Sequence, residues 1–495
     1  MTTMKIKQII LVVASGILTG CGLLGPDYVK PQINSPQKWS ATDKNIHIES
    51  TNLAEMAWWK KFNDPQLNQL IESALQNNNN LQMAMGNIMQ AQASLKKIQM
   101  GWLPTVSMGG VGFTGQSFNP GFQNTSSYPL ANNFSQNNPQ NFDGYTAGFM
   151  PSYTLNVFEL VKQNQIAKLS LEMQKQSANA VALGVIGQVA GSYFSLLGLH
   201  KQLQLQQELL ADAKEMRKYN LIQYQNGSIS DLNLEGIDQY IAGLEGNIPK
   251  IENDITQTEN ALQVLTNNNP GKIKTNRDFD QVTTSGIVPV NLPSSVLKSR
   301  PDIVAAEYQL QINNANIGAV TSMFFPSISL TGVLGQGSVQ LSNLFNAGAD
   351  FWVGQLGAAM PLFNMGLYAE ADKARGSYYT AYYNYVQTVR TAFSQVDNGL
   401  ANHDSLDKVA SQQNIALQKA QNLQKIANKQ YAQGSAAFSD TLGFKLNVDY
   451  AKANLNQIKI QQLNSIVNLY QVLGGGYLAE SQLTKSKKFG DSHDI

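Results

Sequence analysis

The chain has 495 residues, of which 43% are hydrophobic and only 14% are charged, and its formal net charge is +1. Charged residues make up roughly 25% of an average soluble protein, so much of the polarity here comes from Asn and Gln instead. A net charge so close to zero gives no reason to expect nucleic acid or an acidic partner. The single cysteine excludes a disulfide framework and a cysteine metal cluster.

Residues 1–20 have the pattern of a secretory signal peptide. Two lysines precede an apolar run from Ile9 to Leu18, which is too short to span a bilayer as a mature helix. The run ends at Leu18-Thr19-Gly20-Cys21, which resembles the lipobox of bacterial lipoproteins. We therefore expect Cys21 to carry a covalent lipid and to begin an extended N-terminal segment over 21–63. The alternative is an ordinary signal peptide with an incidental cysteine.

Residues 64–265 form the first of two predicted repeats. Asp64 and Pro65 make a helix start, and the asparagine-rich run at 77–80 predicts a break in that helix. After Pro104 the apolar period changes to two, which predicts two strands within about 104–157. We expect a long exposed loop between them at 116–142, where Asn, Gln, Ser, Gly and Pro are abundant.

A long helix follows the two strands. No proline occurs from Phe158 to about Asn226, and apolar residues recur there at intervals of seven. A continuous helix of this length would reach about 100 Å at 1.5 Å per residue. We expect a turn at 224–230, because Gly227 stands where a left-handed residue ends a helix. A second helix would then return antiparallel and complete a helical hairpin.

Residues 299–473 repeat this order of elements. Ser299 is a candidate helix cap, two strands follow within about 327–363, and a proline-free stretch runs from Asn364 to Gln433. The second turn is predicted at 431–437, where Tyr431-Ala432-Gln433-Gly434-Ser435 matches Tyr224-Gln225-Asn226-Gly227-Ser228. The chain is therefore an internal duplication, joined by a proline-containing linker at 266–298 and followed by a polar tail at 474–495 that we expect to be disordered.

The predicted strands match the roughly 9–11 tilted residues that cross an outer membrane, where alternation places lipid on one side and lumen on the other. Four strands cannot close into a barrel, and hydrocarbon does not tolerate an open sheet edge. The strands would have to be pooled between chains, and two copies would give eight strands and three would give twelve. The physical argument leaves both numbers open.

Four segments make the resemblance to a known family specific. They are Arg300-Pro301-Asp302-Ile303, Ala305-Ala306-Glu307, Asn314-Ala315-Asn316-Ile317-Gly318 and Phe325-Pro326-Ser327-Ile328-Ser329-Leu330-Thr331-Gly332. Together they resemble the signature of the outer-membrane efflux proteins of the TolC and OprM type, including the NodT-type lipoproteins. The resemblance covers roughly residues 21–475.

The resemblance implies an α+β membrane protein, in which a homotrimer shares a twelve-stranded transmembrane β-barrel with four strands from each chain. The barrel would continue into a long periplasmic α-helical barrel, with 266–298 forming an equatorial belt. The protein would be lipid-anchored in the outer membrane.

The function implied is the outer-membrane channel-tunnel of a tripartite efflux system, a passive conduit for drugs or other small molecules. Its partners would be a periplasmic adaptor, an inner-membrane transporter of the RND, ABC or MFS class, and outer-membrane lipid. Metal efflux and type I protein secretion are alternative roles for the same outer component.

The resemblance also implies an aperture at the tips of the hairpins, near Gly227, Gly434, Tyr224 and Tyr431. Acidic side chains just after the turn glycines face the closed tip in that family, and Asp440 is the sixth residue after Gly434. The matching position of the first hairpin is Asn233, with Asp231 nearby, and a second acid common in the family is Gly443 here. The alternative is that Asp440 merely starts the last helix.

The sequence offers little support for an enzyme. The four histidines have no cysteine or glutamate at metal-ligand spacing, and no phosphate-binding glycine loop or serine nucleophile elbow is present. No cofactor other than the lipid on Cys21 is expected. A competing interpretation is a coiled-coil surface or pore-forming lipoprotein without a permanent barrel, but it would not explain two strand pairs at equivalent places.

Overall fold

The computed structural model describes residues 25–34, 39, 53–117, 140–275, 277–284, 300–345 and 350–478. Cys21, Ser299, residues 285–298 of the predicted linker and the tail beyond residue 478 lie outside these ranges. Contacts divide the chain into two units that alternate along the sequence: Met1–Val29, Ala91–Ser170 and Gln311–Thr380 in the first, and Lys30–Gln90, Leu171–Leu310 and Ala381–Ile495 in the second.

The order of elements repeats in the described ranges, as the duplication predicts. The first copy holds α2 (Pro65–Asn77), α3 (Asn79–Met100), β1 (Thr105–Ser117), β2 (Gln140–Leu155), α4 (Val157–Gln225) and α5 (Asp231–Leu265). The second holds α6 (Pro301–Ser322), β3 (Ser327–Ser338), β4 (Asp350–Ala359), α7 (Met365–Ala432) and α8 (Phe438–Val472). Short 3-10 helices lie at Leu53–Glu55, Trp58–Phe62, Phe279–Gln281 and Leu341–Asn343.

The helix predictions are confirmed at three informative places. α4 and α7, of 69 and 68 residues, fill the two proline-free stretches. The Asp64 carboxylate caps α2 by accepting from the backbone N–H groups of Gln66 (3.0 Å) and Leu67 (3.2 Å). The break in the asparagine run falls at Asn78, whose side-chain oxygen accepts from the backbone N–H of Asn80 at 2.9 Å and so helps to start α3.

Two boundaries were predicted wrongly. The loop expected at 116–142 is too wide, because β1 continues to Ser117 and β2 already begins at Gln140, with these two residues paired. Ladder hydrogen bonds need only backbone groups, so polar side chains do not end the strands there. β4 ends at Ala359 instead of reaching residue 363, because Pro361 has no N–H to continue a ladder.

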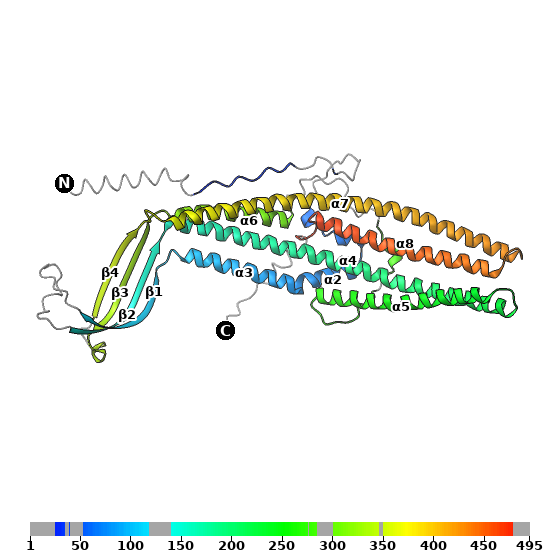
Figure 1. The fold of residues 1–495 in the computed structure, drawn as a ribbon, viewed down its shortest axis with the longest axis horizontal. Coiled ribbons are helices and arrows are strands. Elements are labelled where there is room, and N and C mark those ends of the chain that lie inside the picture. Colours follow the sequence, from blue (N-terminus) through cyan, green and yellow to red (C-terminus); the bar gives the residue numbers. More distant parts are fainter. Residues whose placement is uncertain are drawn as a thin grey trace. The chain divides into compact units, whose positions relative to one another are not determined.

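The first unit contains one antiparallel sheet with the strand order β1-β2-β3-β4 (Figure 1). Asn156 is the single residue between β2 and α4. Its side-chain oxygen accepts from the backbone N–H of Glu159 at 3.2 Å and so caps the start of α4. Its amide nitrogen donates to the Ser322 carbonyl at the end of α6, at 3.3 Å. The strand-to-helix junction of the first copy is thus fastened to the helix-to-strand junction of the second copy.

The second unit has its core where the 3-10 helix Trp58–Phe62 packs against α4 and α8. Trp58 stacks on Tyr470 with ring centroids 4.8 Å apart and planes 6° apart, and both side chains are buried. Phe62 packs against Phe194 at 4.6 Å. Hydrophobic burial of side chains this large is the main stabilising term available to the helices here.

Candidate functional site

The sheet has one apolar and one polar face. The pairing register places Met108, Phe149, Leu334 and Trp352 opposite one another in a single row across all four strands. Each of these side chains is more than half exposed. Large apolar side chains that stay exposed in a continuous row need an apolar surrounding.

The opposite face, called the polar face below, carries mainly small and hydroxylated side chains, together with apolar ones such as Val111, Val333 and Val353. One row across the four strands is Thr105, Ser152, Thr331 and Gln355, and the Thr105 and Ser152 hydroxyls are 2.8 Å apart. The alternation predicted for the strands is therefore confirmed in these two rows, although the polar face is not polar along its whole length. This arrangement suits a wall between lipid and an aqueous lumen.

β2 and β3 approach unusually closely at Gly148 and Gly335, which are paired on the polar face. A Cβ atom on Gly148 would lie 2.4 Å from the Leu334 carbonyl oxygen, and one on Gly335 would lie 2.1 Å from the Ala147 carbonyl oxygen. Only glycine fits at either position without moving backbone.

The outer strands have partners on one side only. Within the described residues β1 pairs with β2 alone and β4 pairs with β3 alone, so each presents a free ladder edge. Together with the exposed apolar face, this makes the sheet of one chain incomplete as a membrane element.

The two hairpin turns have the same geometry, and the prediction of left-handed glycines is confirmed. Gly227 has φ +68° and Gly434 has φ +72°. The N–H of Ser228 donates to the Gln223 carbonyl at 2.8 Å, and that of Ser435 donates to the Gln430 carbonyl at 2.9 Å. These are the bonds of a Schellman motif, which ends a helix and allows the reversal.

Each turn is followed by a helix whose first residues include the predicted aperture positions. Asp440 is exposed, and its carboxylate accepts from the Ala437 N–H at 3.2 Å, which is one half of a capping box. In the first hairpin Asn233 accepts instead from the Ser230 hydroxyl at 3.1 Å. Asp231 and Asn233 are also exposed. Helix capping by Asp440, the alternative considered from the sequence, is thus present, and it leaves the side chain accessible.

An aromatic cluster near the turns could not be recognised from sequence spacing. Phe438 lies 4.6 Å from the ring of Tyr219 and 5.2 Å from that of Tyr431. Partial burial and a hydrogen bond to Tyr431 raise the pKa of Tyr219. Tyr219 belongs to α4, whereas Tyr431 and Phe438 belong to α7 and α8, so the cluster joins the first hairpin to the second. Tyr219 and Tyr431 are 212 residues apart in the sequence.

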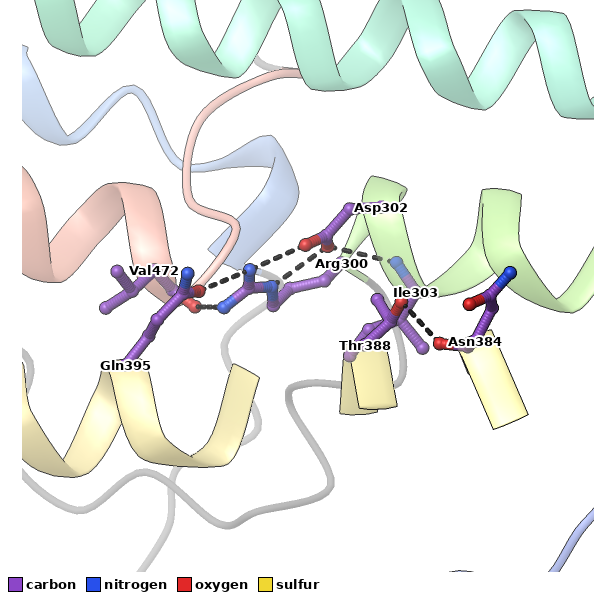
Figure 2. Close-up of polar contacts among 7 residues, drawn as sticks. All are labelled: Arg300, Asp302, Ile303, Asn384, Thr388, Gln395 and Val472. Atoms are coloured by element: carbon purple, nitrogen blue, oxygen red, sulfur yellow. Dashed lines mark hydrogen bonds and ion pairs between the residues drawn. The ribbon is translucent and has the colours of Figure 1, made fainter. Parts of the chain in front are cut away.

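Arg300 of the Arg-Pro-Asp motif fastens the start of α6 to α7 and α8 (Figure 2). Its guanidinium donates to both carboxylate oxygens of Asp302, at 3.0 and 2.7 Å, to the Val472 carbonyl at 2.7 Å and to the Gln395 side-chain oxygen at 2.9 Å. The Arg300 side chain is 8% exposed and the Asp302 side chain is 43% exposed. The motif therefore has a structural use in this chain.

The described residues contain no candidate metal centre. No group of three His, Cys, Asp or Glu side chains that could hold a metal occurs among them. His403 is half-buried beside the Ser465 hydroxyl, with 3.2 Å between Nδ1 and Oγ, and 3.5 Å from Asp407. His403 therefore belongs to the packing contact between α7 and α8.

A family model described as "Outer membrane efflux protein" matches residues 70–268 and 292–475. The chain is 29% identical over 468 residues to the probable outer membrane lipoprotein SilC of Salmonella typhimurium, covering 93% of this chain and 97% of that protein. It is 30% identical over 462 residues to the cation efflux system protein CusC of Escherichia coli K12, covering 93% and 97%. It is 30% identical over 482 residues to the probable efflux pump outer membrane protein TtgC of Pseudomonas putida, covering 95% and 96%.

Among solved structures, the outer-membrane channel OprN has a TM-score of 0.78 against this fold at 23% identity. The match covers 92% of this chain and 99% of that one.

Proposed function

Because the chain belongs to the outer membrane efflux protein family, we propose that three copies of it pool their sheets into one twelve-stranded barrel. The barrel forms the outer-membrane part of an efflux channel, and the helical hairpins form its tunnel in the periplasm. The observation that carries the proposal is the sheet itself, with a continuous apolar row on one face and a free ladder edge at each side.

In a membrane both free edges must be paired, because no water is present to satisfy the backbone groups. Joining the β4 edge of one copy to the β1 edge of the next satisfies both edges in every chain. Three copies place the apolar row against lipid and the Thr105 row in the lumen. The family membership favours three copies over two.

The proposed boundaries between the parts of the chain follow the duplication. We propose that residues 64–265 and 299–473 act as two equivalent repeats, each with a helix, two barrel strands and a helical hairpin. Residues 266–298 form an equatorial linker, and 474–495 form a polar tail. The repeated order of elements in the described ranges supports these boundaries.

The N-terminal anchor is the second part of the proposal. Residues 1–20 act as the signal peptide, and Cys21 carries the lipid and begins the segment to residue 63. Four residues later Gly25, with φ +95°, packs directly on α6: a Cβ there would lie 2.7 Å from the Gly318 Cα. The Pro26 carbonyl accepts from the Asn314 side chain at 2.9 Å. This fixed start supports an anchor immediately before it.

The aperture is the third part. We assign the narrowing to the exposed residues that follow Gly227 and Gly434, with Asp440 as the main acidic ring and Asp231 and Asn233 contributing from the first hairpin. If three Asp440 side chains converge to about 6 Å, each pair repels by about 3 kcal/mol at an effective dielectric near 20. Such a ring favours cations.

The channel serves as a passive conduit and carries out no bond chemistry. Its partners are a periplasmic adaptor and an inner-membrane transporter of the RND, ABC or MFS class. Drugs and other small molecules are the proposed cargo, in keeping with the similarity to TtgC, which is named as an efflux pump component. The similarity to CusC, named as a cation efflux protein, makes metal ions a second candidate cargo.

Single-channel recording in planar bilayers tests the proposal. Purified full-length protein should insert as a water-filled pore with discrete, cation-selective conductance steps. Membranes washed with carbonate provide the second arm: a barrel protein stays with the outer membrane, even when its lipid is absent, whereas a coiled-coil surface lipoprotein is released. Release without conductance would refute the barrel and favour that alternative.

A further inference from the structure

Two carboxyl groups meet where α4 packs against α8, well away from the exposed acids at the hairpin tips. Asp449 of α8 is 3% exposed and Asp212 of α4 is 7% exposed. Lys445, four residues before Asp449 on α8, forms an ion pair with Asp212, and the Asp212 carboxyl contributes to the raised pKa of Asp449. Neither residue belongs to the aperture positions considered above.

The lysines around the two carboxyl groups contact only some of their oxygen atoms. Lys452 donates to Oδ1 of Asp449 at 2.8 Å, and Lys445 forms an ion pair with Oδ1 of Asp212. The second oxygen of Asp449, Oδ2, is enclosed and receives no hydrogen bond from any donor in the part of the chain that the structure describes. A buried oxygen of an ionised carboxylate without a donor is strongly disfavoured.

A carboxylate can only accept hydrogen bonds, so two carboxylates cannot bond to each other without a proton. We propose that Asp449 is protonated at Oδ2 and donates a hydrogen bond to Asp212, and that this bond acts as a clamp between the first and the second helical hairpin of the chain. Lys445 neutralises the Asp212 carboxylate, and Glu215 lies near that lysine.

The surroundings of the pair agree with this assignment. The groups that act on the pair directly are Lys445 and Lys452 on α8, and Asp449 acts on Tyr240 on α5. Glu215 on α4 acts on Lys445, and Tyr450 on α8 acts on Tyr240. Burial, followed by the hydrogen bond to Asp212, raises the pKa of Asp449 above its usual 3.8, although Lys452 acts in the opposite direction. Burial beside Tyr450 and Asp449 also raises the pKa of Tyr240.

The sign of the pH dependence follows from the raised pKa. The packed state binds more protons than the opened state at any pH between 3.8 and the raised value. The clamp is therefore strongest in acid and weakens as pH rises through this window. The equilibrium constant for local opening rises by up to about tenfold for each pH unit. Above the raised pKa the weakening stops, because both states are then ionised.

This inference concerns contacts within one chain, so it does not depend on the shared barrel. Any movement of one hairpin against the other must break the Asp449–Asp212 contact. The clamp therefore makes such movement sensitive to pH at a place other than the exposed acidic ring.

Infrared titration of the purified full-length protein tests for the proton directly. Ordinary Asp and Glu side chains lose the C=O stretch of the protonated carboxylic acid as pH rises through about 4. One group per chain in the wild type should lose this band at a higher pH than the other carboxylic acids, because its pKa is raised. This high-pH component of the band should be absent from Asp449→Asn, whereas it should persist in Asp404→Asn, a change at an exposed acid paired with Lys408.

Hydrogen exchange measured by mass spectrometry supplies the mechanical readout. After correction for the chemical exchange rate, protection of the α4 and α8 peptides around Asp212 and Asp449 should fall with rising pH in the wild type. It should be independent of pH in Asp449→Asn, which mimics the protonated form. Absence of the high-pH component of the infrared band in the wild type, or its persistence in Asp449→Asn, would overturn the proposal; so would an unchanged loss of protection in that variant.

Discussion

Replacing Arg300 tests how strongly the Arg-Pro-Asp motif holds the helices together. Arg300→Ala removes the hydrogen bonds to the Val472 carbonyl and the Gln395 side chain, each worth about 1.5 kcal/mol or more because the donor is charged. It also removes the pair with Asp302, worth about 1 kcal/mol at most, because that carboxylate is 43% exposed. We therefore expect the free energy of unfolding to fall by about 4 kcal/mol.

Arg300→Lys should cost about 2 kcal/mol, because an ammonium retains the charge but cannot reproduce the forked geometry. Tryptophan fluorescence during denaturation is a suitable assay, since Trp58 stacks on Tyr470, two residues before Val472. The matched control is Arg375→Ala, which removes an arginine 64% exposed and paired with Asp372 in the same helix, and should cost less than about 0.5 kcal/mol. Equal losses for Arg300→Ala and Arg375→Ala would refute the reasoning.

Three further substitutions test separate parts of the channel. Gly148→Val should strongly reduce assembled protein in the outer membrane, because its Cβ would lie 2.4 Å from a backbone oxygen. Gly354→Val is the control, because no atom lies within 4 Å of a Cβ there, and equal yields of the two variants would contradict the close approach. Cys21→Ser should abolish lipid labelling while much of the assembled protein still reaches the outer membrane, because one lipid anchors far less firmly than a barrel. If intact-mass analysis of the native protein shows an unmodified Cys21, the lipid anchor is excluded. Asp440→Asn should weaken the block of conductance by multivalent cations added on the periplasmic side and leave assembly intact; an undiminished block would assign the ring elsewhere.

The features that could be predicted from the sequence are those that depend on a local periodicity of residue types. Alternation gave the two faces of β2 and β4, and the absence of proline gave the extents of α4 and α7. Glycines at matched positions gave both turns, because a left-handed residue is a local requirement. The repeated order of elements then followed from comparing one half of the chain with the other.

The features that sequence could not predict depend on contacts between distant segments. Arg300 is recognisable in its motif, but its bonds to Gln395 and Val472 follow only from how α6, α7 and α8 pack. The same holds for Tyr219 against Phe438 and for Asp212 beside Asp449, since no spacing rule relates residues on different hairpins. The strand ends near Ser117 and Gln140 were missed because backbone pairing does not require apolar side chains.

The native mass of the detergent-solubilised protein tests the central claim most directly. A sheet with two free edges should not persist alone, so the particle should contain three chains with no stable monomer. A monodisperse particle of one or two chains would contradict the shared twelve-stranded barrel.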